Sequence, residues 1–243
     1  MRTHFFGTAD RLHLVLMLAL TFSTGVVDAM GYLGLDRVFT GNMTGNVVLL
    51  GMAMAGGTDL PVVRPALALA FFMLGAALAG RLLRRSGEGW SRQTSAALLA
   101  VSVGLWFLTV FVLLVPVHAD PVLGSVVTSA LALLMGTQAA TAKRLKVAEI
   151  TTVVVTSTIT GLASDSRLAG GKGTFWQRRA LAIGLIMLGA LAGAAALHVH
   201  LALALSLAAL IATVVAVAGH SAHRRALAAG GKAGAENPSL ARD

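Results

Sequence analysis

The sequence contains no cysteine, a single tyrosine and few charged residues, which make up 12% of its 243 positions. Without cysteine, the chain can form no disulfide bond, thiolate metal site or cysteine nucleophile. The small charged fraction stands beside 56% hydrophobic residues and a mean hydropathy of +0.81. This composition excludes an ordinary soluble domain and indicates an integral membrane protein.

Recognisable catalytic motifs are also missing. The sequence has no GxSxG nucleophile elbow, no HExxH zinc motif and no P-loop. Three histidines expected in turns, His118, His198 and His200, do not combine with carboxylates at metal-ligand spacing. We therefore expect no enzymatic activity and no bound metal or cofactor.

Positive charge exceeds negative charge, with a formal net charge of +9. The basic residues form short clusters between apolar runs and do not line one face of an amphipathic element. Such clusters are typical of membrane topology signals, because cytoplasmic loops are enriched in Lys and Arg. We therefore expect the lipid bilayer, and no nucleic acid, as a partner.

Six apolar runs are long enough to cross a bilayer, which takes about 20 helical residues. They cover residues 12–33, 65–83, 96–117, 122–142, 180–197 and 200–218. Two further runs, 42–55 and 150–163, are shorter and rich in Thr, Asn or Gly. If both short runs enter and leave on the same side, 17 of the 19 Lys and Arg lie inside and only Arg37 and Arg64 lie outside.

This charge distribution predicts an all-α membrane protein with six transmembrane helices and two short re-entrant or broken segments. Both termini are then cytoplasmic. Residues 1–220 form one transmembrane domain with halves at about 12–117 and 122–219, and residues 221–243 form a flexible cytoplasmic tail.

The two halves show a faint internal similarity. Four identities align between them: Gly25 and Ala29 with Gly136 and Ala140, and Gly51 and Ala53 with Gly161 and Ala163. Since each half has three crossings, the second half must be upside down relative to the first. Inverted three-plus-three repeats with discontinuous segments at matching positions point to a transporter site near the membrane midplane, although channels and scaffolds can be built in the same way.

Polar residues interrupt the apolar sequence at these segments, where hydrocarbon would disfavour them. Asn42 and Asn46 lie four residues apart and would share a helix face, as would Thr152 and Thr156 at the aligned positions. Such groups either line a polar cavity or join helices by hydrogen bonds. The candidate solute-binding residues are Asp28, Asn42, Thr44, Asn46, Gln138, Thr152 and Thr156.

Asp28 lies late in the first span with no cation within a helical turn. It could bind a coupling proton or cation, or it could cap the short segment or pair with Arg37. Gln138 lies near the equivalent position of the second half and would contribute an amide. The adjacent Asp36 and Arg37 are expected to form a local ion pair.

Glycines elsewhere form small-xxx-small ridges, at Gly75 with Ala79 and at Gly189 with Gly193. Such ridges allow helices to approach closely. We expect them to pack the two halves together, with a homodimer face as the alternative.

The blocks Gly25–Ala29 with Tyr32, 39–46 and 136–140 resemble the YoaK-like family of bacterial membrane proteins, over nearly the whole chain before its tail. The resemblance implies a six-span bacterial inner-membrane protein of unknown function and supplies no substrate, cofactor or catalytic residue. The sequence therefore favours a small-solute transporter or channel with a polar midplane site, coupled to a proton or cation. The alternative is a structural or regulatory membrane protein without transport activity.

Overall fold

A computed structural model describes residues 8–56, 60–86, 89–117, 120–145 and 155–236, and these residues form helices and turns without a strand. Among these described residues, six helices are long and apolar enough to cross a membrane. They are α1 (Thr8–Gly34), α3 (Val63–Leu83), α4 (Arg92–Leu114), α5 (Pro121–Arg144), α7 (Trp176–Leu197) and α8 (Leu201–Glu236). Three shorter helices accompany them: α2 (Met43–Met54), α6 (Val155–Ser164) and the 3₁₀ helix η1 (Arg167–Ala169). The predicted all-α membrane protein with six spans is confirmed.

The spanning helices carry apolar side chains on both their inner and outer faces. Leu105, Leu131 and Leu205 are fully buried in the core between the helices. Large apolar side chains also cover the outside, and Phe107 and Leu191 are 68% and 65% exposed. In water such an outer face would be unfavourable, whereas lipid tails solvate it.

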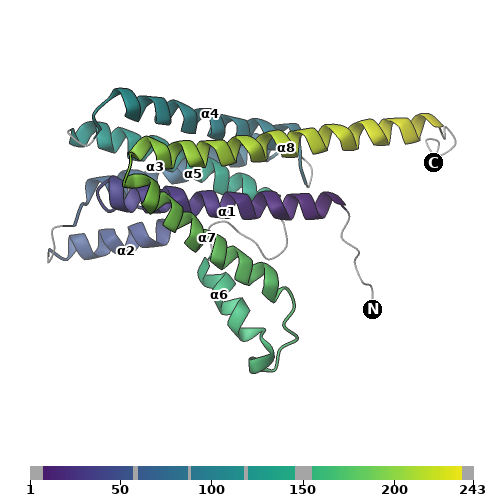
Figure 1. Cartoon of the computed structure of the whole chain (residues 1–243), viewed down its shortest axis with the longest axis horizontal. Coiled ribbons are helices and arrows are strands. Elements are labelled where there is room, and N and C mark those ends of the chain that lie inside the picture. Colours follow the sequence, from purple (N-terminus) through teal and green to yellow (C-terminus); the bar gives the residue numbers. More distant parts are fainter. Residues whose placement is uncertain (1–7, 57–59, 87–88, 118–119, 146–154, 237–243) are drawn as a thin grey trace.

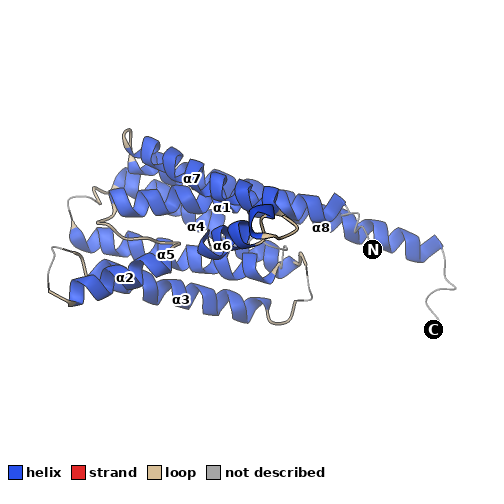
Figure 2. Cartoon of the chain, turned by 90° about the horizontal axis from the view of Figure 1, so that it is seen from below, coloured by secondary structure: helices blue, strands red, loops and turns tan. Residues whose placement is uncertain are grey.

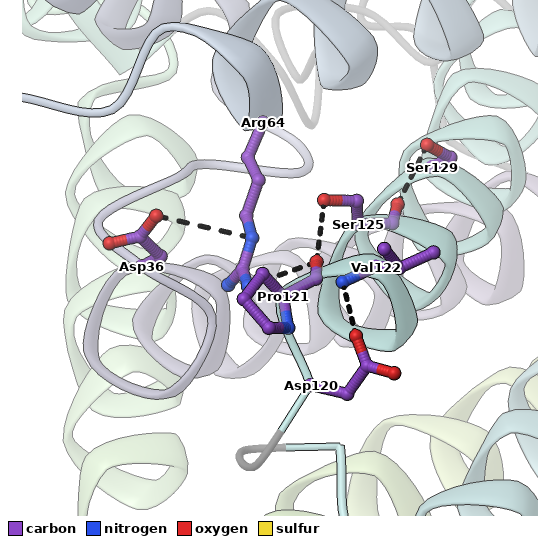
Figure 3. A network of polar contacts seen from close by, with 7 residues as sticks. All are labelled: Asp36, Arg64, Asp120, Pro121, Val122, Ser125 and Ser129. Atoms are coloured by element: carbon purple, nitrogen blue, oxygen red, sulfur yellow. Dashed lines mark hydrogen bonds and ion pairs between the residues drawn. The ribbon is translucent and has the colours of Figure 1, made fainter.

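The ends of three helices meet at one end of the bundle (Figure 3). Arg64, in the first turn of α3, donates to the carbonyl of Pro121 at the start of α5, and its Nε lies 3.9 Å from the carboxylate of Asp36 after α1. At the opposite end, Arg144 of α5 donates to the carbonyl of Ser86 after α3 at 2.9 Å. Helices α3 and α5 therefore run in the same direction, opposite to α1.

This arrangement corrects the expected ion pair between Asp36 and Arg37. Both residues have positive φ angles, 64° and 57°, in the tight turn after α1. The turn brings the carboxylate of Asp36 to the guanidinium of Arg64 instead. Since α1 ends where α3 begins, the chain between them, including α2, leaves and returns to the same end of the bundle.

Helices α1 and α7 cross at a pair of glycines. A Cβ atom on Gly25 would overlap the carbonyl oxygen of Ile186, and one on Gly189 would overlap that of Phe22. Each glycine thus lies against the carbonyl three residues before the other glycine. Near their C-terminal ends the two helices still lie together, because Gly34 lies beside Leu197. They therefore run in parallel.

Helices α3 and α5 cross in the same way. A Cβ atom on Gly75 would overlap the carbonyl oxygen of Leu133, and one on Gly136 would overlap that of Phe72. Gly75 and Gly189, from the two predicted ridges, thus pack helices of one half against helices of the other, as expected. Close backbone contact of this kind needs glycine, because any larger residue would separate the helices.

The packed helix pairs fall into matching sets. Contacts of α1 with α7 and α8 are matched by contacts of α5 with α3 and α4. Contacts of α3 with α2 and α4 are matched by contacts of α7 with α6 and α8, and α4 packs directly on α8. Exchanging the first four helices for the last four therefore reproduces the packing pattern.

Two regions extend from the bundle. Helix α6 and the first turns of α7 project away from the other helices (Figure 1), so that α6 lies in front of the bundle when the molecule is seen from below (Figure 2). Helix α8 continues to Glu236, well beyond the predicted end of the last span (Figure 1). Residues 221–236, which the sequence analysis assigns to a flexible cytoplasmic tail, are helical here, since alanine, leucine and arginine favour a helix. Residues 237–243 lie outside the described part of the chain.

Candidate functional site

The segment between α1 and α2 folds back along α1, and Asp28 holds it there. The Oδ1 atom of Asp28 accepts hydrogen bonds from the backbone N–H groups of Thr40, Gly41 and Asn42 at 3.1, 2.7 and 3.2 Å. Gly41 permits this approach, since a Cβ there would lie 3.0 Å from Thr24 and 3.3 Å from Oδ1. Besides ion coupling, two structural uses are expected for Asp28: capping of the short segment and an ion pair with Arg37. The first of these is present.

All three hydrogen bonds converge on one carboxylate oxygen. In the described part of the chain, no hydrogen bond or ion pair reaches the other oxygen, Oδ2. Arg37, the other expected partner, does not pair with Asp28. Asp28 is 9% exposed, and it lies six residues before the end of α1, or about 9 Å along the helix axis. Asp28 is therefore a nearly buried carboxylate with one oxygen committed and one available.

The two asparagines of the polar block have separate roles. Asn42 is the N-cap of α2, and its Oδ1 accepts from the N–H of Gly45 at 3.3 Å. Asn46 is fully buried, and its amide pairs with both backbone groups of Phe39, accepting from N–H at 2.9 Å and donating to C=O at 2.5 Å. The predicted shared helix face was wrong, because an N-cap residue lies outside the helix and does not follow its periodicity.

A cavity of about 820 Å³ opens beside this segment. Its polar lining comes from Thr24, Asp28 and Tyr32 of α1, Asn42 and Thr44 at the start of α2, and Thr156 of α6. The rest of the lining consists of Phe39, Met52, four aliphatic residues of α2, α6 and α7 (Val48, Leu49, Val155 and Ile186) and two glycines (Gly41 and Gly45). The structure thus brings together Asp28, Asn42, Thr44 and Thr156 from the predicted set.

The remaining predicted residues lie elsewhere. Asn46 is absent from the lining because its amide is used on Phe39. Gln138 is 1% exposed and lies behind the cavity wall, where its amide nitrogen is 3.5 Å from the hydroxyl of Thr24. Its Oε1 has no hydrogen-bond partner within the described residues. Thr152 lies outside the described residues.

Sequence reasoning did not identify Tyr32, Phe39 and Thr24 as site residues. The rings of Tyr32 and Phe39 stack with centroids 4.9 Å apart and an interplanar angle of 27°. The signal available was weak: Tyr32 is the only tyrosine of the chain, and Phe39 begins the polar block. Their proximity depends on the tight turn at Asp36 and Arg37, which the sequence pattern did not reveal.

The cavity contains groups that can bind a solute. The lining offers a carboxylate oxygen, hydroxyl groups, an amide and two aromatic rings, and none of the lining residues that the structure describes is basic. Across the described residues, no group of three or more His, Cys, Asp or Glu side chains is arranged to hold a metal ion. Among the described residues, Asp28 is the only acidic residue in the lining.

The model of the family described as "Protein of unknown function (DUF1275)" matches residues 16–218. A similar protein is the UPF0700 transmembrane protein YoaK of Bacillus subtilis (strain 168), with 35% identity over 197 residues, covering 76% of this chain and 84% of that protein. No solved structure matches the chain.

Proposed function

The chain belongs to the DUF1275 family of unknown function, and we propose that it is a small-solute transporter or channel of the bacterial inner membrane. The observation that carries this proposal is the cavity between α1, α2, α6 and α7. Its polar lining includes Asp28, Asn42 and Thr44 from one half of the chain and Thr156 from the other. Polar groups in a membrane-spanning region are typical of a solute pathway.

The proposed architecture is an inverted three-plus-three repeat with α2 and α6 as re-entrant segments. Three observations support it. Helix packing is reproduced when the two halves are exchanged. The glycine crossings of α1 with α7 and of α5 with α3 use equivalent residues, Gly25 with Gly189 and Gly136 with Gly75. Helices α1 and α5 run in opposite directions, as an inverted repeat requires.

The proposed orientation has both termini in the cytoplasm. It rests on the distribution of positive charge, because 17 of 19 Lys and Arg lie on one side under this topology. Arg64 is one of the two basic residues on the outer side, and its guanidinium pairs there with the carboxylate of Asp36. In this orientation the cavity wall formed by Asp28 lies nearer the outer face.

In the proposed mechanism, Oδ2 of Asp28 exchanges a proton or cation during the transport cycle. Oδ1 keeps the segment before α2 in place through its three hydrogen bonds. The hydroxyls of Thr44 and Thr156, from opposite halves, orient the solute. Motion of one half against the other would then alter their separation.

A structural or regulatory role without transport is the second candidate. One observation favours it: Asp28 and Asn46 already have local structural partners, in the backbone of residues 39–42. In that case their polarity would serve the fold alone. Small-residue contacts and basic loops would then bind a second copy or anionic lipids.

Cysteine accessibility distinguishes these functions without a known substrate, because the natural chain contains no cysteine. Thr44→Cys and Thr156→Cys introduce single thiols into the cavity, and Leu168→Cys provides a fully exposed control that the proposed orientation makes reactive in inside-out vesicles. Transport predicts that membrane-impermeant thiol reagents modify both cavity cysteines in right-side-out and in inside-out vesicles. Modification of only the control would contradict a solute pathway.

A further inference from the structure

We infer that the solute bound in this cavity is a small organic monocation, such as an alkylammonium or quaternary ammonium compound. This inference rests on the proposed function, since it names the substrate class of the same site. It follows from three features of the described lining residues: an available carboxylate oxygen, a pair of aromatic rings and no basic side chain among them.

The carboxylate of Asp28 presents the charge. Its Oδ1 is saturated by three N–H groups, and Oδ2 receives no hydrogen bond from the described residues. A buried carboxylate without a counter-ion is unfavourable, so a cation in the cavity would supply the missing partner. A neutral solute would not itself pair with this charge, whereas an organic cation would be both the solute and the cation that Oδ2 exchanges in the proposed mechanism.

The start of α2 argues against an anionic solute. A helix N-terminus attracts anions, but here the position beside it is already taken by the carboxylate of Asp28, and Asn42 caps the N–H of Gly45. Since the described residues that line the cavity include no lysine, arginine or histidine, an anion would meet the negative charge of Asp28 without a compensating positive charge from them.

The aromatic rings favour an organic cation over a metal ion. Tyr32 lies one helical turn after Asp28, stacks on Phe39, and both rings line the cavity. Ring faces attract alkylammonium groups through cation–π interactions, and quaternary ammonium ligands are bound in this way by aromatic cages. The nearby Val48 and Met52 would contact the alkyl groups. Hard divalent ions are instead bound by several carboxylate or carbonyl oxygens, and the described lining offers the single carboxylate of Asp28.

A pair of charged thiol reagents tests this inference. Thr156→Cys is treated with a trimethylammonium-ethyl and with a sulfonatoethyl methanethiosulfonate, and the ratio of the two rates is divided by the ratio at Leu168→Cys. We expect the cavity to favour the cationic reagent by at least about tenfold, which corresponds to about 1.4 kcal/mol. Adding Asp28→Asn should abolish this preference, whereas Asp28→Glu should retain part of it. Asp36→Asn, outside the cavity, is the matched control.

Protection experiments examine the rings. Choline should slow modification of Thr156→Cys, whereas its uncharged isostere 3,3-dimethylbutan-1-ol should not. Tyr32→Phe should keep this protection, and Tyr32→Leu should weaken it because the ring face is lost. Equal modification by both reagents, or equal protection by choline and its isostere, would overturn the cation assignment while leaving a solute pathway intact. Failure of both reagents to reach the cavity would refute the proposed function itself and the assignment with it.

Discussion

Replacement of Asp28 by alanine tests the structural role of this carboxylate most directly. The change removes the acceptor of three backbone N–H groups, those of Thr40, Gly41 and Asn42. Each unsatisfied buried donor costs about 1–3 kcal/mol. Because Asp28 lines a cavity, water can reach part of the vacated space. We therefore expect a loss of about 3 kcal/mol in the free energy of unfolding, at the lower end of the sum.

Replacement of Asp28 by asparagine should cost much less. The amide oxygen can still accept the same three hydrogen bonds, each weaker by about 1 kcal/mol because the acceptor is no longer charged. Removal of a nearly buried charge from a low-dielectric site offsets this loss. We expect a net change within about 1 kcal/mol of the wild-type free energy of unfolding.

Thermal unfolding in one detergent measures both effects. For a chain of this size, the alanine variant should unfold roughly 6–12 °C below the wild type, and the asparagine variant within roughly 4 °C of it. Asp36→Ala is the control, since Asp36 is 53% exposed and its ion pair with Arg64 is 3.9 Å long. If Asp28→Ala and Asp36→Ala unfold at the same temperature, the three hydrogen bonds do not hold the segment.

Three further predictions concern packing, topology and the second buried amide. Gly75→Ala should lower the unfolding temperature, because its Cβ would overlap a carbonyl of α5 and overpacking costs about 1–3 kcal/mol. Gly80→Ala is the control, since Gly80 lies on the same helix with open space around it, and this variant should be neutral or stabilising. Reporter fusions after Gly56 should report the outside and fusions after Gly170 the inside; the opposite result at Gly56 would establish that α2 crosses. Asn46→Ala should lower the free energy of unfolding by about 2 kcal/mol, since both backbone groups of Phe39 lose their partner. An unchanged unfolding temperature would mean that those two hydrogen bonds make no net contribution to stability.

The spanning helices were predictable because their signal is local. A bilayer requires about 20 apolar residues in a row, and each of the six runs satisfies this requirement without reference to its neighbours. Gly75 and Gly189 were predictable as packing sites for the same reason, since small residues spaced by four mark a close helix contact. Charge distribution predicts the sidedness, which hydropathy lacks, and the reporter fusions test it.

The site was predictable in composition but not in geometry. Asp28 and Thr156 were selected because polar groups are unfavourable in lipid, and both line the cavity. Asn42 lines the cavity whereas Asn46 is buried against Phe39. This difference depends on where α2 begins, which helical periodicity does not determine. The partner of Asp36 depended likewise on two consecutive positive φ angles, and Tyr32 joined Phe39 only through that turn.

Asp28 links the structural role of this region with its proposed solute-binding role, because its two carboxylate oxygens make different contacts. Oδ1 positions the backbone of residues 40–42, and this backbone places Asn42 and Thr44 in the cavity wall. Any ligand on Oδ2 would therefore act on a group that also shapes the binding site. Asparagine keeps the acceptor and removes the charge, so it separates the tasks: a stable variant without cation preference assigns the charge to the solute. A stable variant with unaltered preference would assign the carboxylate to the fold alone.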